Sequence, residues 1–208
     1  MHRKHGGPVV FGLVIAMAWI VATAHATTLR KLSLQELTGY ADSIVIGKCE
    51  KKQAVWMEKR VITISTIRVS HKAKGDHAPG NAIEVHTLGG RVDKPLPIYM
   101  MVPGAEHIAE GEEMLLFLEK YGDKKQFHRL VGMAQGKIPV TTDPKTGKKT
   151  VHSGEPIKGV QWVDKNGKPV APGTVGAQEA PAEPGDLDGF LGRLHKIQKE
   201  HEAKGGAK

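Results

Sequence analysis

The chain has 208 residues, with 30 lysines and arginines against 22 acidic residues and a formal net charge of +8. This length suits one domain of moderate size with a short appendage. The basic residues are spread along the chain, only 5% of the residues are aromatic, and no motif interleaves rings with basic side chains. The composition therefore argues against nucleic-acid binding, and it is compatible with a weak, unspecific attraction to anionic envelope surfaces.

The first 26 residues have the pattern of a cleaved signal peptide. A basic start precedes an apolar run from Val9 to Ala22, and Ala24-His25-Ala26 fits the small-x-small motif of signal peptidase. We expect cleavage between Ala26 and Thr27, which places the mature chain in the periplasm or outside the cell. The alternative is an uncleaved anchor in the inner membrane. No second long apolar segment follows, so we predict no membrane span in the mature chain.

A short helix and a first strand are predicted near the start of the mature chain. Ser33 and Glu36 have the spacing of a capping box, and the apolar residues after them share one helical face, so we expect a helix over residues 34–41. Alternating apolar and polar residues then predict a strand over 43–49, which continues in bent form toward Lys59.

The only cysteine of the chain, Cys49, lies in this strand on the face opposite to Ile44 and Ile46. One cysteine cannot close an intrachain disulfide, and no recognisable motif places a histidine beside it. We therefore interpret the thiol as a half-buried, structural side chain. An intermolecular disulfide, a lipid-type attachment and a nucleophile are the alternatives.

The segment "RVITISTIRVSHKAKGD" predicts a long strand because it is rich in β-branched residues. Ile62 and Ile64 share one face of this strand, whereas Ile67 and Val69 share the other. If both pairs are buried, the inward face has to switch, and we predict a β-bulge near residues 65–66 that bends the strand. Such a bend favours a small closed barrel. The alternative is a flat strand that is buried without any switch.

More strands follow, separated by turn residues. In the strand expected at 82–88, Glu84 and His86 are predicted to face solvent. Residues 89–111 are rich in proline and glycine and predict a long loop with a short strand near 98–102; loops of this length are often functional. The remaining segments predict two hairpins, 114–118 with 126–132 and 137–141 with 150–152.

The composition changes after Trp162, which predicts a domain over 27–163 and a linker rich in proline, glycine and alanine over 164–185. Residues 186–208 then predict a terminal helix with a frayed end. Its apolar stripe consists of Leu187, Phe190, Leu191, Leu194 and Ile197. This stripe packs on the chain's own domain or, alternatively, docks on a partner.

These elements predict a mostly β fold, with a short N-terminal helix, a C-terminal amphipathic helix and a small antiparallel barrel. A bulged, coiled first pair of strands suits an oligonucleotide/oligosaccharide-binding (OB) barrel better than a flat sandwich.

The motifs "ADSIVIGKC", "VITISTIRVSHKAKG", "GEEMLLFLEK" and "LVGMAQGKIPV" follow one another from Leu32 to about Val151. In this order and spacing they resemble a group of exported bacterial small β-barrel proteins without an assigned activity. More remotely, the order is similar to the netrin-like OB domain of tissue inhibitors of metalloproteinases. Those inhibitors place an N-terminal cysteine on the zinc of a peptidase, whereas this mature chain would begin at Thr27. The resemblance therefore implies a fold and carries over no inhibitory residue.

The sequence contains no motif of a catalytic site. It has no Gly-x-Ser-x-Gly elbow, phosphate-binding glycine loop or HExxH helix, and we predict neither an enzyme nor a cofactor. The most site-like segment is "YMMVPGAEH", in which Met100, Met101 and His107 provide thioether and imidazole ligands that suit copper.

Three hypotheses about function follow. The leading one is an exported, non-enzymatic binding or protein-interaction module that uses the 89–111 loop and one barrel face, with an envelope protein as a possible partner. The second is a regulator or inhibitor of a zinc peptidase, which rests on the remote resemblance alone. The third is a periplasmic copper-handling protein that uses Met100, Met101 and His107.

Overall fold

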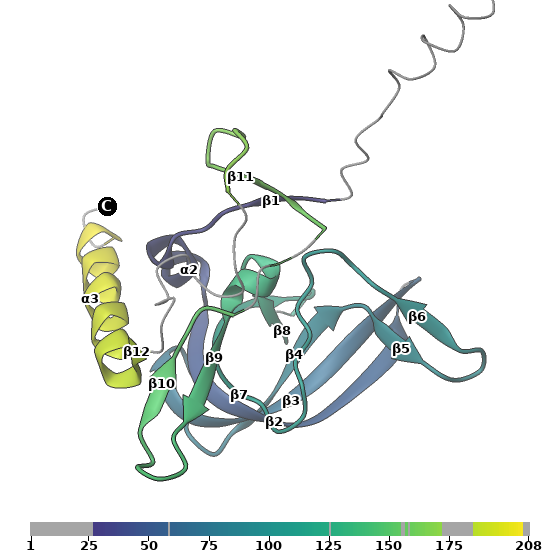
Figure 1. Cartoon of the computed structure of the whole chain (residues 1–208), viewed down its shortest axis with the longest axis horizontal. Helices are drawn as coiled ribbons and strands as arrows, with labels where there is room; N and C mark the ends of the chain where they lie inside the picture. The colour runs from purple at the N-terminus through teal and green to yellow at the C-terminus, as the bar shows by residue number, and fades with distance from the viewer. Residues whose placement is uncertain are drawn as a thin grey trace, which may run out of the picture.

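The computed structural model describes residues 27–57, 59–124, 126–154, 157, 159–171 and 185–205. The chain is mostly β, with a short helix near the start and a long helix at the end (Figure 1), and this confirms the predicted class and both predicted helices. The elements in chain order are β1 (Thr28–Arg30), α2 (Leu34–Tyr40), β2 (Ser43–Met57), β3 (Arg60–Lys74), β4 (Ala82–Leu88), β5 (Gly90–Val92), β6 (Ile98–Met100), β7 (Glu113–Tyr121), β8 (Phe127–Leu130), the 3-10 helix η1 (Met133–Gly136), β9 (Lys137–Thr142), β10 (Lys149–Val151), β11 (Gln161–Val163), β12 (Gly185–Asp186) and α3 (Leu187–Gly205).

Eight strands form one sheet in the order β12-β10-β9-β7-β2-β3-β4-β8. The last strand, β8, pairs in parallel with β4 and also pairs antiparallel with β7, from Leu118 opposite Leu130 to Tyr121 opposite Phe127. The strands β2, β3, β4, β8 and β7 therefore pair in a ring, and the sheet is partly closed. The ring has an inner and an outer face, and each face is covered differently.

The long strands β2 and β3 form a curved ribbon, drawn in blue in Figure 1. Their register shifts at three places, where Glu50 of β2 and Ser70 and Ala73 of β3 have no partner on the opposite strand. The hydroxyl of Ser70 donates to the carbonyl of Ile46 at 3.2 Å. Extra residues of this kind increase the local twist and bend the ribbon, which helps to bring the two ends of the sheet together.

The predicted switch of the inward face of β3 near residues 65–66 is wrong: the bulge at this level belongs to β2, where Glu50 has no partner opposite Thr66 and Ile67. β3 pairs with β4 from Ile62 to Arg68 without any shift, so the faces of β3 do not switch in this segment. Ile67 and Val69 lie on the inner face and are buried, and Ile62, on the outer face, is only 8% exposed. Both faces of the ribbon are covered here, and both apolar pairs find contacts without a change of face.

The inner face of the ring holds one hydrophobic cluster, which contains Val45, Cys49, Ile67, Val69, Ile83, Val85, Ile108, Met114, Leu116, Leu118 and Leu130. Cys49 is a free thiol that is 1% exposed, and burial raises the pKa of this thiol. Its position on the face opposite to Ile44 and Ile46 is confirmed, and it is buried more deeply than predicted.

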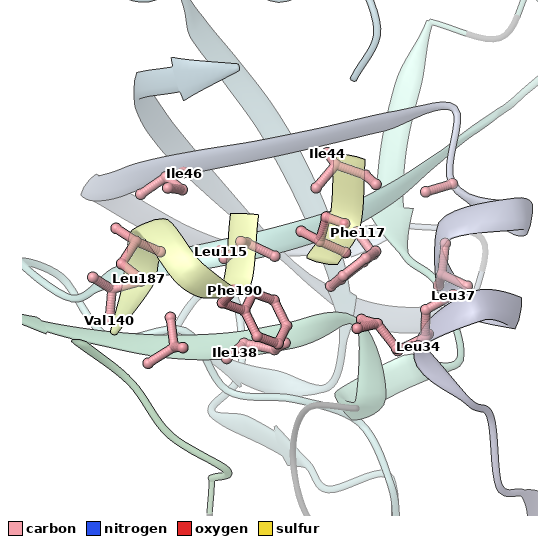
Figure 2. Packing of buried hydrophobic residues seen from close by; sticks show 14 of the residues in the cluster. Leu34, Leu37, Ile44, Ile46, Leu115, Phe117, Ile138, Val140, Leu187 and Phe190 are labelled. Carbon is pink, nitrogen blue, oxygen red and sulfur yellow. The ribbon is translucent and has the colours of Figure 1, made fainter. Parts of the chain in front are cut away.

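The outer face carries a second cluster, in which the two helices pack against the sheet (Figure 2). Leu34 and Leu37 of α2 and Phe190 of α3 contribute to this cluster together with Leu115 and Phe117 of β7. The predicted capping box starts α2, because the Ser33 hydroxyl accepts from the amide of Glu36 and the Glu36 carboxylate accepts from the amide of Ser33.

The helix α3 packs on the chain's own domain. Leu187, Phe190 and Leu194 are buried in the outer cluster, and Leu191 and Ile197 pack against its edge. The apolar stripe predicted for this helix is therefore occupied within the chain, which favours the first of the two predicted alternatives.

Two predicted segments lie wholly or mainly outside the described residues: the signal peptide, residues 1–26, and the linker, residues 164–185, of which 172–184 are not described. Before that gap, the amide of Asp164 donates to the carbonyl of Lys168, and β11 pairs in parallel with β1. No helix in the described part of the chain is both long enough and apolar enough to span a bilayer.

The contribution of α3 can be tested by truncating its most buried ring. Phe190 is 1% exposed, and we expect Phe190→Ala to lower the free energy of unfolding by about 3 kcal/mol or more, because it leaves a cavity in the outer cluster. The exposed Lys196 on the same helix is the control, and Lys196→Ala should change stability by less than about 0.5 kcal/mol. Urea unfolding measures both; equal, small effects would contradict this role of α3.

Candidate functional site

A cleft of about 660 Å³ opens on the outer face of the ring, and we call it the outer cleft. The end of the β2–β3 ribbon, the strands β4, β7 and β8, and the turn between β7 and β8 form its walls. Ala105 and Glu106 of the long loop, with Gly132 and Met133, close one side. Its lining residues include Met57, Arg60, Ile62, His86, Leu88, Glu106, Glu119, Tyr121, Asp123, Phe127, Arg129 and Met133. These residues are distant in sequence, and the ring closure brings them together.

Three rings form the aromatic part of this cleft. His86 stacks on Phe127, with ring centres 4.8 Å apart and planes 30° apart, and its Nδ1 lies 2.5 Å from the hydroxyl of Tyr121. His86 is 5% exposed, whereas Tyr121 and Phe127 are half-buried. The expectation that His86 faces solvent is therefore wrong, because the β7–β8 hairpin covers its outward side.

The other ring nitrogen of His86, Nε2, is buried and has no hydrogen-bond partner among the described residues. A buried polar atom without a partner costs free energy, and such atoms are rare in native proteins. Burial lowers the pKa of His86 below its ordinary value of 6.5, so the ring is neutral at pH 7 and one of its nitrogens carries a proton. The cleft thus contains an unused polar atom beside aromatic rings.

Charges of both signs surround this aromatic part. The guanidinium of Arg129 donates to the carboxylate of Glu119 at 2.9 Å and lies 5.5 Å from the centre of the Tyr121 ring. Arg60 and Asp123 are exposed at the edge of the cleft. The cleft is therefore apolar at its floor and mixed in charge at its rim.

A pair of histidines lies beside this site, where the β3–β4 turn meets β8. The Nε2 atoms of His77 and His128 are 3.0 Å apart, and Nδ1 of His128 is 3.3 Å from the carbonyl oxygen of Glu84. A carbonyl can only accept, so His128 donates from Nδ1 and accepts at Nε2 from His77. Burial lowers the pKa of both histidines, and the nearby ammonium of Lys120 adds to the shift, whereas the carboxylate of Asp76 opposes it for His77.

These histidines predict a loss of stability in mild acid. Their folded pKa values lie below the ordinary value of 6.5, so the unfolded chain binds more protons between the two values. The free energy of unfolding should be constant above about pH 6.5 and should decrease as the pH falls below it. Urea unfolding at about pH 7.5 and about pH 5.5 measures the difference.

The double variant His77→Gln/His128→Gln should reduce this acid-dependent loss, because it removes two of the three groups. His195→Gln, on the exposed side of α3, should leave the loss unchanged. An identical loss in all three proteins would exclude the histidine pair as its source.

A second hollow of about 720 Å³ contains a cluster of buried charges. The ammonium of Lys137 lies 2.7 Å from a carboxylate oxygen of Glu106 and 2.6 Å from one of Glu112, and the side chains of Lys137 and Glu106 are only 6% and 11% exposed. Burial raises the pKa of Glu106, although the charge of Lys137 opposes the shift. One cation therefore joins the segment before β7 to the start of β9.

Removing the ammonium of Lys137 should lower the free energy of unfolding. Lys137→Met leaves two carboxylates facing each other in a largely buried site, and we expect the free energy of unfolding to fall by about 3 kcal/mol or more. Lys148 pairs with Asp186 at 3.4 Å on the surface, and Lys148→Met should cost less than about 1 kcal/mol. Urea unfolding of both variants measures the difference, and similar losses would contradict the special position of Lys137.

Two of the three residues predicted for copper, Met101 and His107, line this hollow. Met101 is 73% exposed, whereas Met100 ends β6 and is half-buried. Nε2 of His107 lies 3.0 Å from the ammonium of Lys52 and therefore accepts from it. No group of three or more His, Cys, Asp or Glu side chains in the described part of the chain could hold a metal ion.

Of the two residues at the predicted signal-peptide cleavage site, Ala26 lies outside the described residues, and the carbonyl of Thr27 accepts from the amide of Gln161. The sequence did not reveal the outer cleft, because Tyr121 and Phe127 were part of an ordinary hairpin signal. The nearest indication was the aromatic content of this turn in a chain that has few aromatic residues.

Comparison with known proteins gave no further identification: no protein-family model matches the chain, and no curated protein matches it.

Proposed function

We propose that this chain is an exported, non-enzymatic binding module that holds a segment of an envelope partner protein in the outer cleft. The observation that carries this proposal is the unpartnered Nε2 of His86: the nitrogen itself is buried, but its ring stacks on Phe127 and belongs to a residue that lines the cleft. A ligand that hydrogen-bonds to this nitrogen and covers the rings would remove the cost of an unsatisfied polar atom. A polar atom among apolar groups is also typical of binding sites.

The pairing of the strands supports an OB-like barrel as the scaffold. Five ring strands, β2, β3, β4, β7 and β8, follow one another in the chain, and they pair in the order first, second, third, fifth and fourth. OB barrels have five strands in a partly open Greek key, and they bind ligands on the face of the second and third strands and at two loops, between the first and second and between the fourth and fifth strands. The outer cleft lies at the corresponding β3, β4, β2–β3 and β7–β8 positions.

The mixed rim favours a protein segment over a nucleic acid. Glu119 and Asp123 line the same cleft as Arg60 and Arg129. These carboxylates would repel a chain of phosphates, whereas a peptide can offer both signs of charge and apolar side chains.

The two alternative hypotheses stay predictions. No contact among the described residues favours a zinc-peptidase regulator, and the ammonium beside His107 competes with a copper ion for that nitrogen. Inhibition assays against zinc peptidases test the first alternative. Titration with Cu(I), before and after replacement of Met100, Met101 and His107, tests the second.

Site-specific photo-crosslinking in the envelope tests the proposed function. A photoreactive amino acid is placed at Leu88 or at Asp123, which are exposed at the cleft, and at Lys196 on α3 as the matched control. We expect one partner to be crosslinked from both cleft positions and not from Lys196. No crosslink at the cleft, or equal crosslinks at all three positions, would overturn the proposal.

A variant of His86 separates binding from folding. His86→Phe keeps a ring against Phe127 but removes both ring nitrogens, the unpartnered Nε2 and the Nδ1 beside the Tyr121 hydroxyl, so the free energy of unfolding should fall by no more than about 1.5 kcal/mol while crosslinking at Leu88 falls at least tenfold. Unfolding in urea checks the first expectation. Unchanged crosslinking by a folded His86→Phe variant would show that this nitrogen is not used.

A further inference from the structure

The exposed apolar side chains of this protein are concentrated at one end of the molecule. Among the described residues, seven large hydrophobic side chains are exposed, and five of them lie on or beside the β5–β6 hairpin: Trp56, Leu96, Ile98, Tyr99 and Met101. Leu96 and Tyr99 are each 68% exposed. We call these five residues the hairpin patch. Clusters of this kind mark interaction surfaces, whereas single exposed hydrophobic residues are ordinary.

The fold explains why Trp56 belongs to this patch. A side chain at Gly90, the first residue of β5, would meet Ala54 and Val61, so β5 packs on that face of the ribbon. Trp56 is two residues after Ala54 and pairs with Val61, which places it on the same face, one step closer to the ribbon's end. Figure 1 shows the β5–β6 hairpin projecting at the end of the molecule opposite to α3.

Basic residues accompany these apolar side chains. The segments 57–60 and 90–101 contain four basic residues, Lys59, Arg60, Arg91 and Lys94, against the two acidic residues Glu58 and Asp93. Arg91 pairs with Asp93 at 2.7 Å on the surface, and Lys94 is exposed. The projecting end of the molecule is thus both apolar and cationic.

We infer that the hairpin patch docks on the surface of an anionic lipid bilayer. Tryptophan and tyrosine prefer the interface of a membrane, leucine and isoleucine enter its apolar part, and lysine and arginine approach anionic headgroups. A projecting hairpin can insert its tip into a flat surface, whereas the outer cleft, with its mixed charges, suits a partner's side chains. The bilayer contact therefore goes beyond the proposed binding in the cleft, because none of the five residues of the hairpin patch lines the cleft.

The processed chain, from Thr27 to Lys208, is the protein for the test, because residues 1–26 are apolar enough to enter vesicles by themselves and all described elements lie after them. This chain contains two tryptophans, Trp56 at 53% exposure and Trp162 at 2%. Trp56 is thus a natural reporter. Vesicles of phosphatidylethanolamine and phosphatidylglycerol should shift its fluorescence to shorter wavelengths, and brominated lipids should quench it.

Variants of the hairpin patch test whether its residues make the contact with the bilayer. Leu96→Glu should reduce the partition coefficient roughly tenfold or more, and Lys94→Ala about fivefold. Tyr40→Ser is the matched control, because Tyr40 is 54% exposed but lies in α2, and partitioning should be unchanged. Vesicles of phosphatidylcholine alone should bind the protein more weakly.

Two outcomes would overturn the inference. One is the absence of partitioning, or partitioning that Leu96→Glu leaves unchanged. The other is a concentration-dependent dimer, seen by analytical ultracentrifugation and lost in Leu96→Glu, which would assign the patch to a second copy of the chain. The cleft variant His86→Phe should partition as the unchanged protein does, so failure of the cleft proposal and failure of the bilayer contact are distinguishable.

Discussion

The two hydrophobic cores lie on opposite faces of β2 and β7, and the rest of the structure depends on β7 being buried on both faces. Met114, Leu116 and Leu118 point into the ring, whereas Leu115 and Phe117 support the helices on the outside, and all five are fully buried. One edge of β7 pairs with β2, and the other is divided between β9 and β8. A continuous apolar run is the pattern that such a position requires. The strand that closes the ring therefore also carries α3.

Residues of the sequence motifs that carry the resemblance make contacts that stabilise the ring of strands and α2. Lys137 of the "AQGK" motif binds Glu112 of the "GEEMLLFL" motif, and Lys74 donates to the carbonyls of Thr38 and Ala41 at the end of α2 at 2.9 and 2.6 Å. A side chain at Gly47 would lie 2.5 Å from Ile67, so glycine permits the close approach of β2 and β3. These contacts stabilise the fold, and they do not indicate what the fold binds.

The difference between local signals and contacts of distant segments explains how much of the structure could be predicted from the sequence. Alternation and turn residues predicted eight of the twelve described strands but missed the short β1, β5, β11 and β12, and the capping box of Ser33 predicted α2, since these signals are local. The parallel pairing of β4 with β8 and of β1 with β11, the position of the bulges, and the cover over His86 depend on contacts between distant segments. Such contacts between distant segments form the outer cleft, and therefore no short sequence motif could predict it.

Several titratable side chains of this protein are engaged within the fold. Glu106 and Glu112 are engaged by Lys137, His77 and His128 bind each other, and the thiol of Cys49 is buried with a raised pKa. These side chains therefore stabilise the fold or are buried in it. What the described surface offers instead is an aromatic cleft with one unpaired nitrogen and an apolar, cationic hairpin. Because the two lie at the same end of the β2–β3 ribbon, a partner held in the cleft would be held close to any surface that the hairpin touches.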